Sequence, residues 1–90
     1  MNDQSIVLSS LAMDLKRAAL AFWRGSTGVA QKFLGESLER KKEINMKEID
    51  PYISNVLKDI NNKDAEDLLM YSILIQNYVR KNGHDSRLAP

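Results

Sequence analysis

Residues 68–79, LLMYSILIQNYV, place the strongest constraint on the fold, because their apolar side chains do not fit a single helical stripe. Residues 68 to 71 are all apolar or aromatic, and together they occupy a full helical turn. A helix that is apolar on nearly every side needs cover on every side. The segment therefore predicts either a central helix within one chain or a helix shared between two chains.

We interpret this pattern as favouring a second copy of the chain, since three companion helices in a chain of 90 residues give limited cover. The candidate dimer interface consists of Leu69, Met70, Ile73, Leu74, Gln76 and Tyr78. Ser72 and Gln76 lie one turn apart on this helix. Our hypothesis is that they hydrogen-bond across the interface and fix its register.

Three further helical patterns precede this segment. Apolar residues recur at spacings of three and four, and the spacing predicts helices over residues 5–24, 27–43 and 51–60, followed by the fourth over 65–82. Asp50-Pro51 and Asp64 are typical helix starts, and Gly83 is expected to end the last helix. The sequence thus predicts an all-α, antiparallel four-helix bundle in residues 1–82, with a flexible tail in residues 83–90.

The corner between the first two predicted helices, RGSTG at residues 24–28, has two interpretations. It resembles a short anion-binding loop, but no strand pattern precedes it and no lysine stands beside its Ser and Thr. Gly25 suits the left-handed conformation that closes a helix, and Ser26 or Thr27 suits the cap of the next one. We therefore interpret the segment as a helix corner.

The residue types of the chain argue against most enzyme classes. There is no cysteine and only one histidine, His84, so neither a zinc site of the usual ligands nor a di-iron bundle site is expected. No nucleophile–base pair or phosphate-binding loop stands out. We expect no metal and no cofactor, and we favour a non-enzymatic protein.

Basic residues gather in the first half of the chain, where residues 1–42 hold seven basic and four acidic side chains. The candidate basic surface consists of Lys16, Arg17, Arg24, Lys32, Arg40, Lys41 and Lys42. A cationic last helical turn explains the run at residues 40–42, because it meets the negative end of the helix dipole. An acidic partner or RNA is the alternative reason for the run.

The segment RKNGH, residues 80–84, is similar to the arginine–histidine pairing of HEPN-type helical ribonucleases, which also dimerise to form their sites. The resemblance implies Arg80 and His84 as a catalytic pair. Three residues separate them, which is a shorter interval than is usual in that family, and one of the three is Gly83.

Taken together, these patterns predict a non-enzymatic protein–protein interaction or regulatory module that presents a helical surface, as a homodimer. The alternative is an RNA-associated helical protein, either a binder or a HEPN-like ribonuclease. No apolar run is long enough to span a bilayer, so we expect no membrane association and a cytoplasmic protein. An unidentified protein partner remains compatible with the same surface.

Overall fold

The computed structural model describes the backbone of residues 3–61 and 64–88 and the side chains of residues 4–61 and 64–81. The elements in chain order are the helices α1 (Asp3–Trp23) and α2 (Thr27–Lys41), the short 3₁₀ helix η1 (Met46–Glu48), and the helices α3 (Pro51–Lys58) and α4 (Ala65–Leu88). Every regular element in the described ranges is helical. The all-α class predicted from the sequence is therefore confirmed.

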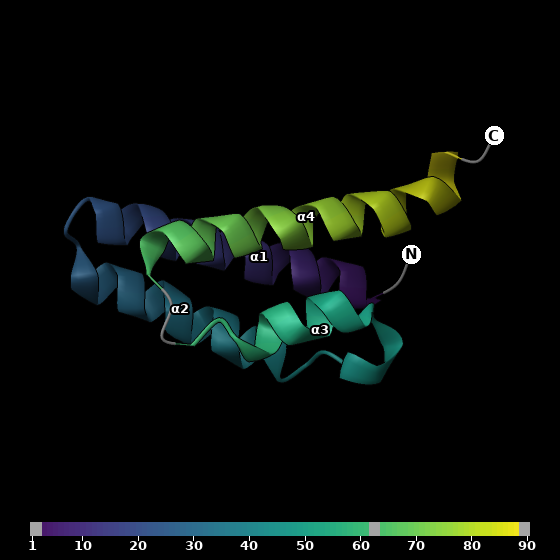
Figure 1. Ribbon diagram of the computed structural model, residues 1–90, viewed down its shortest axis with the longest axis horizontal. Coiled ribbons are helices and arrows are strands. Elements are labelled where there is room, and N and C mark those ends of the chain that lie inside the picture. Colours follow the sequence, from purple (N-terminus) through teal and green to yellow (C-terminus); the bar gives the residue numbers. More distant parts are fainter. Residues whose placement is uncertain (1–2, 62–63, 89–90) are drawn as a thin grey trace.

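The helix α1 is the common neighbour of the two other long helices. It packs along α2 and along α4, and both run antiparallel to it (Figure 1). The short helix α3 contacts α4 and η1 (Figure 1). The helices pack as a bundle, and α1 and α3 of the same chain cover α4 in part: Leu68 and Ile75 are buried, whereas Met70 and Ile73 are each 48% exposed.

One continuous core joins these elements. Leu8, Leu11 and Leu15 of α1 are buried in it, as the three-and-four spacing predicted. The other large members come from the later elements: Ile44, Ile49, Ile53, Val56, Leu57, Ile60, Leu68 and Ile75. Burial of one such side chain stabilises a fold by about 2 kcal/mol. The connection between α2 and α3 is thus held to the core by Ile44 and Ile49.

The corner between α1 and α2 is formed as a helix end. Gly25 has a φ of 81°, its N–H donates to the carbonyl of Phe22 (3.0 Å), and the N–H of Ser26 donates to the carbonyl of Ala21 (2.8 Å). This pair of bonds is the Schellman arrangement that satisfies the last carbonyls of a helix. Ser26 occupies the N-cap position of α2, but its side chain makes no capping hydrogen bond, so the expected cap is wrong in that detail.

The starts of α3 and α4 follow the sequence signals. The Asp50 carboxylate accepts a hydrogen bond from the N–H of Tyr52 (2.8 Å), with Pro51 in the first turn. The Asp64 carboxylate likewise accepts from the N–H of Asp67 (2.9 Å). Both aspartates therefore satisfy amides that have no partner inside their own helix.

The helix ends agree with the sequence-based bounds to within two residues, except at the end of α4. That helix continues to Leu88, so the prediction that Gly83 ends it is wrong. Glycine lowers helix propensity by about 1 kcal/mol, which a long helix with a packed apolar face tolerates. The flexibility expected of residues 83–90 stays a prediction, since their side chains lie outside the described residues.

Alanine substitution at two glycines, Gly25 in the corner and Gly35 within α2, should change the free energy of unfolding in opposite directions. We expect Gly25→Ala to lower the free energy of unfolding by about 1–2 kcal/mol, because its positive φ strains any residue with a Cβ. Gly35→Ala, on the exposed side of α2 with open space around its Cβ, should raise it by about 0.5–1 kcal/mol. Urea denaturation measures both. A stabilising Gly25→Ala would contradict this account of the corner.

Candidate interaction surface

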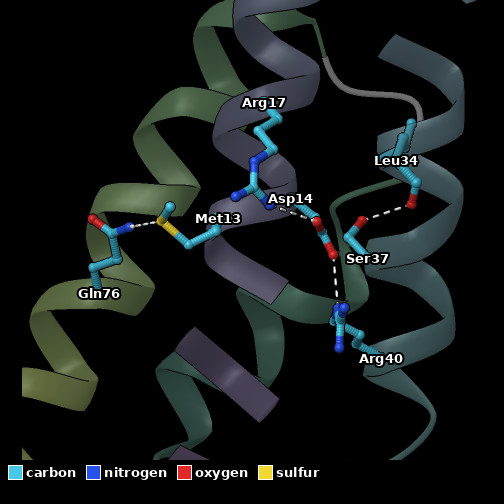
Figure 2. A network of polar contacts seen from close by, with 7 residues as sticks. All are labelled: Met13, Asp14, Arg17, Leu34, Ser37, Arg40 and Gln76. Carbon is cyan, nitrogen blue, oxygen red and sulfur yellow. Dashed lines mark hydrogen bonds and ion pairs between the residues drawn. The ribbon is translucent and has the colours of Figure 1, made fainter. Parts of the chain in front are cut away.

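A buried carboxylate joins α1 to α2. The side chain of Asp14 is 3% exposed, and its Oδ2 accepts a hydrogen bond from Nε of Arg40 at 2.8 Å. Its Oδ1 accepts from Arg17 at 3.4 Å (Figure 2). Arg17 also lies over the ring of Phe33, 5.8 Å from its centroid. A carboxylate so placed needs its partners, because an unpaired buried charge is strongly unfavourable.

Arg40 contributes to the packing of the bundle in a way that the sequence did not reveal. Glu36 and Arg40 lie four residues apart on α2, but the guanidinium crosses to Asp14 on α1 (Figure 2). The hydrogen bond and charge of Asp14 raise the pKa of Arg40 above its usual value. The usable signal was Asp14 itself, an acidic residue between Leu11 and Ala18 on the buried side of α1.

The rest of the basic run at residues 40–42 is also engaged within the chain. Nζ of Lys41 donates to the carbonyl of Leu57 (3.3 Å), which ties the end of α2 to α3. Nζ of Lys42 lies 3.0 Å from Glu39 in an exposed pair. The dipole explanation therefore misses that two of the three cations, Arg40 and Lys41, make tertiary contacts.

Three further members of the candidate basic surface have exposed side chains. Lys16, Arg24 and Lys32 are exposed on α1, at its end and on α2, respectively. Arg80 is exposed on α4, whereas the side chain of His84 lies outside the described residues. The cations with the most constrained positions, Arg17, Arg40 and Lys41, already contact groups of the same chain.

The six residues of the candidate dimer interface fall in three places. Met70 and Ile73 are exposed on the outer side of α4. Leu69 and Gln76 lie toward α1, where Nε2 of Gln76 lies 3.6 Å from Sδ of Met13 (Figure 2). Leu74 and Tyr78 lie toward α3. Of these six residues, only Met70 and Ile73 are large apolar side chains left exposed within one chain, each by 48%.

Ser72 does not contribute to any such surface. Its side chain is fully buried inside the monomer, and its hydroxyl has no hydrogen-bond partner. The hypothesis that Ser72 bonds across an interface together with Gln76 is therefore wrong for Ser72. The helix brings the two residues one turn apart, but α1 covers the first of them.

An apolar face runs along both α1 and α4 on the side away from α2. Ile6, Met13 and Leu20 recur every seven residues on α1, so they share one side of that helix. Together with Met70 and Ile73 they form what we call the outer face, and each is 38–53% exposed. Since Met13 contacts Gln76 and the helices are antiparallel, Ile73 lies at a level between Met13 and Leu20.

The apolar excess of residues 68–79 predicted the α4 half of the outer face, whereas its α1 half was not predicted. The heptad spacing of Ile6, Met13 and Leu20 was visible in the sequence. It was hidden by the stronger stripe of Leu8, Leu11 and Leu15, which fixes the buried side of the same helix. Single exposed apolar residues are ordinary on protein surfaces, whereas a row across two packed helices is typical of an interaction site.

A second feature is a surface hollow of about 270 Å³ between α3 and α4. Ile53 and Leu74 line it together with Tyr52, Tyr78, Asp50, Asn77 and Lys81. The Tyr78 hydroxyl accepts a hydrogen bond from the N–H of Asp50 (3.2 Å), which joins its two walls. Its volume lies at the small end for ligand pockets, and it is the size of a side chain rather than of a cofactor.

Within the described residues, no three His, Asp or Glu side chains are grouped as a metal site would require. No helix there is long and apolar enough to cross a membrane. Comparisons of the chain with protein-family models, with curated proteins and with solved structures gave no match. The surface features above are therefore the basis for inferring function.

The buried carboxylate gives a quantitative prediction. Asp14→Asn keeps the shape of the side chain but removes its charge, so we expect a loss of about 1–3 kcal/mol in the free energy of unfolding. Lys42→Ala is the control, because it removes an ion pair whose side chains are 71% and 72% exposed; its effect should stay below about 0.5 kcal/mol. Equal effects in urea denaturation would show that the buried pair contributes no more than the exposed one.

Proposed function

We propose that this protein is a non-enzymatic interaction module that works as a homodimer, with the outer face of α1 and α4 as its self-association surface. The observation that carries the proposal is the row of five exposed apolar side chains across two helices packed against each other. Burial of such a row releases ordered water and is the main favourable contribution to protein association.

A second copy is a suitable occupant because a twofold pair buries the same face on both chains. Closed twofold dimers are the commonest assemblies of soluble proteins, and each surface in them complements itself. A chain of 90 residues also gains more from such an interface than a large domain does, since it buries a smaller fraction of its own surface. The regulatory role would then belong to the helical surfaces that the dimer leaves exposed.

Substitution on the outer face tests the proposal. We expect the native chain to have the mass of a dimer in size-exclusion chromatography with light scattering at micromolar concentration. Ile73→Lys should raise the dimer dissociation constant at least tenfold, because it places a charge in an apolar contact. Val29→Lys is the matched control: Val29 is 46% exposed against 48% for Ile73, but it lies on α2.

Two results would count against the proposal. A native chain that is monomeric at every concentration up to the millimolar range would exclude self-association as its function. A Val29→Lys variant that dissociates as readily as Ile73→Lys would place the interface elsewhere. Circular dichroism of both variants establishes that the change lies in association and not in folding, since both sites are half exposed.

A further inference from the structure

The outward side of α4 carries charges of opposite sign at residues 66 and 80. Glu66, Met70, Ile73, Asn77 and Arg80 follow one another at spacings of four, three, four and three, so they form one stripe along the helix. All five are exposed. Neither Glu66 nor Arg80 takes part in an ion pair within the described part of the chain. Ile73 lies seven residues from each, at the centre of the stripe.

A stripe with this pattern complements itself when two copies run in opposite directions. We propose that α4 pairs with α4 of the partner subunit in antiparallel orientation, with the twofold axis at Ile73. This inference rests on the proposed function and assigns its partner, orientation and register. Glu66 of each chain then lies opposite Arg80 of the partner subunit, and the interface holds two such pairs related by symmetry.

The same axis places the α1 part of the outer face in register. Residue 16 of α1 lies level with Ile73, because Met13 lies level with Gln76 and the helices are antiparallel. Met13 and Leu20 stand three and four residues from that level, on either side. Met13 of each chain therefore lies at the level of Leu20 of the partner subunit. The apolar pairs of α1 and the charged pairs of α4 select one register together.

Other arrangements of the same face complement each other less well. In a parallel pair, Glu66 would lie beside its own copy and Arg80 beside its own copy, so both ends would repel. If α4 were to pack on α1 of the partner subunit, Glu66 would lie near Arg24, but Arg80 would lie near Ser9 and Ser10, which carry no charge. Only the antiparallel α4 pair places an opposite charge against both ends.

Cysteine cross-linking tests the register directly, because the native chain has no cysteine. Ile73→Cys should cross-link to itself under mild oxidation, since a residue on a twofold axis meets its own copy. A mixture of Glu66→Cys and Arg80→Cys should give the mixed dimer, and Glu66→Cys alone should give little product. Rapid cross-linking of Glu66→Cys to Arg24→Cys, without the Arg80→Cys product, would overturn the register and leave the proposed homodimer standing.

Charge reversal supplies a second, independent test. Glu66→Arg and Arg80→Glu should each weaken the dimer about tenfold, because each converts two attractive pairs into repulsive ones. An equimolar mixture of the two variants, or the double variant, should recover the native dissociation constant. No recovery in a chain that still dimerises would overturn the antiparallel pairing. A native chain that is monomeric would instead overturn the proposed function itself.

Discussion

The packing of α1 against two neighbours at once is the constraint on which the rest of this structure depends. Ala12, Ala18, Ala19 and Ala21 are all buried, and their small side chains let α2 and α4 approach the helix closely. Leucines at positions 8, 11 and 15 then supply the apolar bulk of the core. Both neighbours leave part of α1 uncovered. The side of α1 that carries Ile6, Met13 and Leu20 is exposed, and α4 lies next to it.

The Asp14–Arg40 pair adds specificity to this packing. An apolar contact between α1 and α2 tolerates sliding and rotation, whereas the directional bond from Arg40 of α2 to the buried carboxylate of Asp14 on α1 fixes the relative position of the two helices. The contact from Lys41 to the carbonyl of Leu57 extends the same function to α3. Two of the basic residues that suggested an RNA surface, Arg40 and Lys41, therefore contact other helices of the same bundle.

Local signals predicted the helices well, because Gly25, Asp50 and Asp64 act on amides and carbonyls a few residues away. The partner of Arg40 and the burial of Ser72 depend on which helix lies next to which, and a single sequence does not specify that. The outer face illustrates both cases. Its α4 half was expected from an excess of apolar residues, while its α1 half required knowledge of which side of α1 faces the core.

The apolar excess of α4 and the heptad row of α1 have one physical explanation in common. A chain this short has limited room to bury apolar residues on every side of its helices, and Ile6, Met13, Leu20, Met70 and Ile73 are left 38–53% exposed. In the proposed dimer, apolar contact alone would leave the orientation of the two chains open. The opposite charges proposed to pair across it, Glu66 and Arg80, would remove that freedom, because only the antiparallel orientation places each beside the other.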